Sequence, residues 1–169
     1  MSFLSFCQWL ADTAWSTSIR ESTWTYPIIE SVHVLSLCLF LGLAALWDLR
    51  LLGVSLKRVP VSEVSARLFP WMVGGFVLMV LSGVGLFTSD PVRFYGNIFF
   101  RIKAVALVLA GINAFMFHNS KAGKTIVDWD LATVTPGQAK TAGVISLVLW
   151  AIIVVTGRFI AYNWFKPLV

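Results

Sequence analysis

Residues 27–47 read PIIESVHVLSLCLFLGLAALW, and this stretch decides the class of the fold. A helix needs about 20 predominantly apolar residues to cross the hydrocarbon core of a bilayer, and this stretch has both the length and the composition. Three further stretches meet the same criterion, at residues 69–87, 98–117 and 143–162. The sequence therefore predicts an all-α, transmembrane four-helix bundle that forms a single integral membrane domain over residues 1–169.

The composition of the whole chain agrees with a membrane protein. Of its 169 residues, 58% are hydrophobic and 12% are charged, and the mean hydropathy is +0.82. Soluble domains carry about 25% charged residues. The net charge of +5 comes from single basic residues spread along the chain, which argues against a nucleic-acid interface. The lipid bilayer is the expected partner.

The first twenty residues follow a different pattern from the four spans. Phe3, Phe6, Leu10 and Ala14 recur at helical spacing, and polar side chains occupy the other faces. Because this apolar stripe is too narrow for a span, residues 1–20 are predicted to form an amphipathic interfacial helix.

Basic residues in short loops indicate the orientation of the chain, because they resist translocation. The first and third loops carry more of them than the opposite side does: Arg50, Lys57, Arg58, Arg67, Lys121, Lys124 and Lys140, against Arg20, Arg93 and Lys166. We therefore expect a multi-pass protein of the bacterial inner membrane with both termini in the periplasm.

Ionisable side chains inside the spans are costly in lipid, and they mark functional sites by default. At 1.5 Å of rise per residue, one layer near the outer ends of the helices collects Glu30, His33, Arg101, Lys103 and Arg158. Two interpretations are open for this layer. The basic side chains can snorkel to the headgroups and form a structural ion-pair network with Glu30. Alternatively, the layer binds an anionic or redox-active ligand, with His33 as the candidate metal ligand.

The only two histidines, His33 and His118, suggest a haem with two histidine ligands. Their depths differ by about 20 Å at helical rise, whereas two axial ligands of one iron need nearly equal depth. A haem on His33 would need a different second ligand or none, and Met79 is the thioether at a suitable depth. At the inner ends of the spans, we expect a structural contact from Asp48 to His118 or Lys121.

Short motifs in three of the spans resemble an uncharacterised family of bacterial four-helix inner-membrane proteins. The residues that carry the resemblance are Phe100, Arg101, Lys103, Asn113, Phe117, His118, Trp150, Gly157, Arg158, Ile160, Ala161 and Tyr162, together with His33 and the DLRLLG segment at 48–53. More distantly, the chain resembles copper-resistance D-type and cytochrome-b-like membrane domains. That resemblance implies redox or metal chemistry in the membrane.

The sequence thus favours a membrane electron-transfer or quinone- or haem-handling subunit with a polar site in the outer leaflet. Haem b or a quinone would contact His33, Glu30, Arg101, Lys103 and Arg158, and a membrane or periplasmic redox protein would be the partner. The rival expectation is a non-redox membrane anchor or assembly subunit, or a small proton-coupled carrier. The chain has no GxSxG, HExxH or phosphate-loop motif, so we expect a subunit rather than a self-sufficient enzyme.

Overall fold

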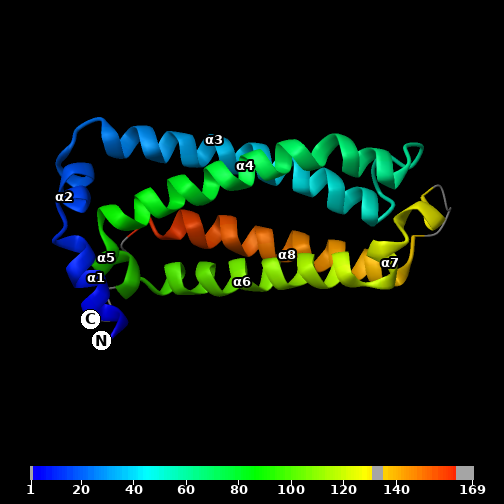
Figure 1. The fold of residues 1–169 in the computed structure, drawn as a ribbon. Coiled ribbons are helices and arrows are strands. Elements are labelled where there is room, and N and C mark those ends of the chain that lie inside the picture. The colour runs from blue at the N-terminus through cyan, green and yellow to red at the C-terminus, as the bar shows by residue number, and fades with distance from the viewer. Residues whose placement is uncertain (1, 131–134, 163–169) are drawn as a thin grey trace.

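The structure, a computed structural model, describes residues 2–130 and 135–162, and over these ranges the chain is helical without strands. Four helices are long and apolar enough to cross a membrane: α3 (Thr25–Leu51), α4 (Val61–Ser89), α6 (Ile98–Asn119) and α8 (Gly137–Phe159). The short elements are α1 (Phe3–Ala11), α2 (Ala14–Glu21), α5 (Pro91–Gly96), α7 (Lys121–Lys124) and the 3-10 helix η1 (Ile126–Trp129). The predicted helical bundle with four apolar spans is confirmed (Figure 1).

Helix α4 is longer than the apolar stretch at residues 69–87 from which it is predicted. It begins at Val61, so Pro70 lies inside the helix and not at its start. Proline removes one backbone hydrogen bond from a helix interior. Membrane helices tolerate it because neighbouring groups can take up the freed carbonyl.

The bundle consists of two helix pairs. Helix α3 packs along α4, α6 packs along α8, and contacts between α3 and α8 join the pairs (Figure 1). Glycines lie at the closest approaches. A Cβ on Gly75 of α4 would lie 3.2 Å from the Cβ of Phe40, and one on Gly143 of α8 would lie 3.2 Å from the carbonyl oxygen of Asp48. Small residues thus determine how closely α3 approaches both partners.

The core lies where the two pairs meet. Its buried members are Phe40, Ala44, Met79, Ala106, Ala110, Trp150 and Ile153. The rings of Phe40 and Trp150 meet edge to face, with 4.8 Å between their centroids. Such a pair adds about 0.5–1.5 kcal/mol to the effect of apolar burial. The aromatic contact therefore helps to hold α3 against α8.

The N-terminal segment forms two short helices, which corrects the expectation of one helix over residues 1–20. The break lies at Asp12 and Thr13, where the Thr13 hydroxyl donates to the Leu10 carbonyl at 2.7 Å and accepts from the Ser16 N–H at 3.3 Å. These bonds end α1 and cap α2. Both helices lie across one end of the bundle, with α1 against α5 and α2 against α4 and α3 (Figure 1). Cys7 and Ser16 are fully buried there.

At the opposite end, side chains tie the loops between the helices together. Arg50 is only 4% exposed, and it donates from Nε to the Val59 carbonyl and from Nη2 to the Asp130 carbonyl. The Trp129 ring is buried and donates from Nε1 to the Ala122 carbonyl at 3.0 Å. The Asp130 carboxylate accepts from the backbone N–H and the hydroxyl of Ser62, in the first turn of α4. Asp130 thus caps α4 from a distant part of the chain.

We expect the Asp130→Ala variant to lower stability by about 0.5–2 kcal/mol at neutral pH, the range for loss of a helix cap. Burial acts to raise the pKa of Asp130, but hydrogen bonds from Ser62 and the Arg50 charge outweigh it and hold the pKa below its usual value. The contribution is therefore present above the pKa of the unfolded chain and disappears as the pH falls through the folded-state pKa. Thermal unfolding of the variant and the wild type at several pH values measures this difference.

The exposed neighbour Asp128 provides the control, since no hydrogen bond of its side chain is found among the described residues. Asp128→Ala should unfold like the wild type at every pH. Equal losses in the two variants would contradict a specific cap at Asp130.

Candidate functional site

A cavity of about 1000 Å³ lies between the two helix pairs. This volume is at the upper end of the range of about 300–1,000 Å³ for ligand pockets. Helices α4 and α6 border it without packing along each other (Figure 1). Its walls are mainly apolar and rich in aromatic rings, among them Phe40, Phe76, Phe87, Phe94, Phe100 and Trp150. The cavity is thus suited to a large, largely apolar molecule.

His33 is a half-buried polar residue on the α3 side of the cavity. Its Nδ1 lies 3.0 Å from the Met79 carbonyl oxygen and 3.1 Å from the Ser82 hydroxyl oxygen. Because a carbonyl can only accept, Nδ1 carries the proton and donates, and the other nitrogen keeps its lone pair. Among the described residues Nε2 has no hydrogen-bond partner, and it is not sealed off by neighbouring atoms. This is the arrangement in which a histidine binds a metal or accepts a proton.

The backbone of α4 makes room for the histidine ring. A Cβ on Gly83 would lie 3.2 Å from Cε1 of His33, closer than an ordinary van der Waals contact. Glycine at this position therefore lets the imidazole lie flat against α4, with Nδ1 in reach of the Met79 carbonyl.

Lys103 lines the same cavity from α6. It is half-buried, and the nearest helix is α8, where a Cβ on Gly157 would lie 3.5 Å from the Lys103 Nζ. No described residue forms a hydrogen bond or an ion pair with this ammonium group. A positively charged side chain and His33 thus line the same apolar cavity.

The other predicted site residues lie toward the end of the bundle beside α5, which we call the outer end or rim; the end beside α7 is called the inner end (Figure 1). Glu30 and Arg158 are exposed, and both line the cavity. The Arg158 guanidinium lies over the Tyr162 ring, 5.3 Å from its centroid, and donates from Nη2 to the Tyr162 hydroxyl at 3.2 Å.

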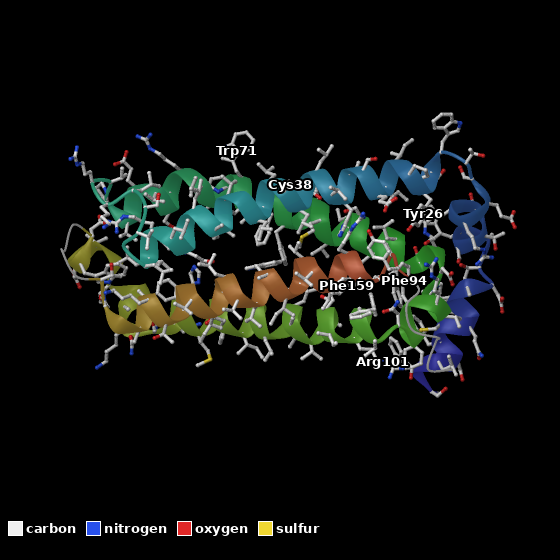
Figure 2. The ribbon with its side chains drawn as sticks, turned by 180° about the vertical axis from the view of Figure 1, so that it is seen from behind. Tyr26, Cys38, Trp71, Phe94, Arg101 and Phe159 are labelled. Carbon is white, nitrogen blue, oxygen red and sulfur yellow. The ribbon has the colours of Figure 1, made fainter. Side chains whose placement is uncertain are left out.

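Arg101 is the exception, because it does not line the cavity. Its guanidinium lies over the Tyr95 ring at 4.9 Å, its Nε donates to the Tyr95 carbonyl, and it projects away from the bundle interior (Figure 2). The expected convergence of Arg101 with His33 is therefore wrong. Residues 101 and 103 are about 200° apart around a helix, so they cannot share a face. Helical rise gives the position of a residue along the helix axis, but it does not give the face of the helix on which the side chain lies.

Two residues at the outer end were not predicted as part of the site. Tyr26, labelled in Figure 2, and Arg93 both line the cavity. Arg93 belongs to α5, whose first turn is capped by the Asp90 carboxylate. The Asp-Pro start of that short helix is a sequence signal that could have identified it.

The inner end of the cavity contains Asp48, which is 4% exposed. The expected contact with His118 or Lys121 is wrong. His118 is exposed and uses Nδ1 to bond the Ala114 carbonyl of its own helix, at 2.8 Å. Asp48 instead lies against α8, where the Ser146 hydroxyl is its neighbour. The described residues contain no group of three or more His, Cys, Asp or Glu side chains that could hold a metal, so His33 is a single candidate ligand.

The fold and the cavity define a class: a polytopic helical membrane protein with a lateral apolar cavity and polar groups at both ends. The chain belongs to the family of unknown function DUF6644, whose model matches residues 9–163. No curated protein and no solved structure matches the chain.

Proposed function

We propose that this integral membrane protein is an electron-transfer or quinone- or haem-handling subunit that holds a planar redox molecule in its cavity. The observation that carries the proposal is the state of His33, a residue that lines the cavity: its Nδ1 is bonded to the Met79 carbonyl, and its Nε2 has no partner among the described residues.

The residues present fit haem b in two respects. The Nε2 of His33 has the lone pair that an axial ligand needs. Lys103 and Arg158 supply positive charge for the propionates at the outer end. Met79 lies on α4 directly beside His33, since its carbonyl accepts from the histidine, so both belong to one wall of the cavity. Of these two residues, His33 would hold such a group from this wall, because the Met79 carbonyl is already engaged with the histidine ring. Bound haem would supply one-electron redox chemistry.

The same residues fit a quinone. The Lys103 ammonium can donate to a quinone carbonyl, and Nε2 of His33 can accept from a quinol hydroxyl. The aromatic walls suit the flat ring and an isoprenoid tail. Haem b and a quinone each have a planar ring, and each would place polar groups toward His33 and Lys103. The experiment described next distinguishes between them.

The test is to purify the full chain in mild detergent, record its absorption spectrum, and extract it with organic solvent for quinone and lipid analysis. A b-type spectrum identifies haem, and quinone in near-stoichiometric amount identifies a quinone. A colourless preparation without quinone contradicts the proposal.

A second candidate function is a small proton-coupled carrier. It is favoured by one observation: ionisable side chains line the same cavity at both ends, with Glu30 and His33 near one end and Asp48 at the other. A colourless preparation that moves protons across vesicles would support this alternative.

We further propose that the protein lies in the bacterial inner membrane with both termini in the periplasm, where a redox partner could reach the outer rim. Reporter fusions after Arg58, Asp90, Lys124 and Val169 should report inside, outside, inside and outside, because the loops richest in basic residues resist translocation. A C-terminal fusion that reports inside would contradict this orientation.

A further inference from the structure

A second polar cluster lies at the inner end of the cavity, and the proposed redox function does not use it. Asp48 of α3 is 4% exposed, and its Oδ2 is buried without a hydrogen-bond partner among the described residues. Gly143 allows α8 to pass close to the Asp48 backbone, since a Cβ there would lie 3.2 Å from the Asp48 carbonyl oxygen. One turn later, the Ser146 hydroxyl lies against the carboxyl group. Both Asp48 and Ser146 line the cavity.

Asn113 of α6 completes the cluster. Its Nδ2 donates to the Ala142 carbonyl at 3.0 Å, next to Gly143, which places Asn113 near the level of Asp48. This bond fixes the orientation of the amide and leaves Oδ1 available as an acceptor, together with the second N–H of Nδ2. Asn113 also lines the cavity. The cluster thus combines a carboxyl group, a hydroxyl group and an amide oxygen.

No cation neutralises Asp48 within the described part of the chain. On its own helix, Arg50 donates to the Val59 and Asp130 carbonyls. On α6, His118 bonds the Ala114 carbonyl, and α4 and α8 place no charged side chain against the carboxyl group. The ion pair found among the described residues joins Arg67 and Glu63. A lone carboxylate in an apolar interior is very costly, and proton uptake removes that cost.

We propose that Asp48, with Ser146 and Asn113, forms a proton-binding site at the inner end of the cavity, at which Asp48 takes up and releases the proton. Ser146 donates to the carboxyl group, and the Asn113 amide oxygen is the acceptor available at that level for its proton. Because the same cavity reaches His33 and Lys103, the site can exchange protons with whatever occupies the cavity. The inference depends on the cavity alone and not on which ligand fills it.

The test uses dicyclohexylcarbodiimide, an apolar reagent that modifies protonated carboxyl groups inside membranes. Its nitrogen takes the carboxylic proton, the carboxylate oxygen attacks its central carbon, and the product rearranges to a stable N-acylurea. We expect peptide mass spectrometry of the full-length protein in lipid vesicles to locate the adduct at Asp48. The yield should fall several-fold from acidic to alkaline pH, because the reaction needs the protonated form.

Two variants test whether the adduct forms specifically at Asp48. Asp48→Asn keeps the side-chain size but should lose the inner-end adduct, whereas Glu30→Gln, at the exposed rim, should keep it. The position of the adduct in the wild-type protein tests the inference even if the Asp48→Asn variant folds poorly. An absence of adduct at Asp48, or a yield that does not change with pH, overturns the inference. Labelling does not depend on cofactor content, so this result and the spectroscopic result can fail independently.

Discussion

The His33→Ala variant is expected to purify without the bound redox molecule, whereas His118→Ala is expected to retain it. If the molecule is haem, the absorbance per protein should fall to background in the first variant, because alanine has no lone pair to replace Nε2. If it is a quinone, the amount extracted per protein should fall in the same way. His118 cannot substitute, since its Nδ1 is bonded to its own helix and its depth is that of the other end of the bundle.

The comparison of the His33→Ala and His118→Ala variants also controls for an effect on folding. Each variant replaces one imidazole in a long helix, and both should elute from a sizing column as the wild type does. Loss of the cofactor in both variants would indicate a general effect on the bundle. Full retention in both would mean that His33 does not contact the ligand.

The Gly75→Leu variant is expected to lose much of its thermal stability in detergent, and Gly74→Leu is expected to lose little. A Cβ on Gly75 would already lie 3.2 Å from the Phe40 Cβ and 3.3 Å from its backbone nitrogen, so a leucine must push α3 away from α4. Overpacking costs about 1–3 kcal/mol, and more where the neighbour is backbone that cannot rotate aside.

Gly74 is a matched control because it precedes Gly75 on the same helix and a Cβ there would meet nothing within 4 Å. The two variants therefore share their change in helix propensity and differ in what the side chain meets. Melting curves followed by circular dichroism or by aggregation measure the difference. Equal melting temperatures for the two variants would show that α3 and α4 do not pack as described.

The spacing of glycines in the sequence predicts a close helix approach, but it does not show which residue each glycine meets. The second span contains Gly74, Gly75, Gly83 and Gly85, and hydropathy treats them alike. In the folded protein, a Cβ on Gly75 would meet the Phe40 backbone and one on Gly83 would meet the His33 ring, while one on Gly74 would meet nothing within 4 Å. Such contacts depend on the rotation of each helix about its axis, which a bundle acquires only when its helices pack.

The sequence by itself determined that this chain is a helical membrane protein with four spans, because length and hydropathy are properties of each segment separately. It also predicted the positions of His33 and Lys103 along their helix axes, because helical rise is constant along the chain. Only the tertiary structure decided which side chains share the cavity: it turned Arg101 outward onto Tyr95, brought Arg93 to the rim, and placed Asp48 against α8. The physical reason is that depth is set by a single helix, whereas a shared face is set by the packing of helices against one another.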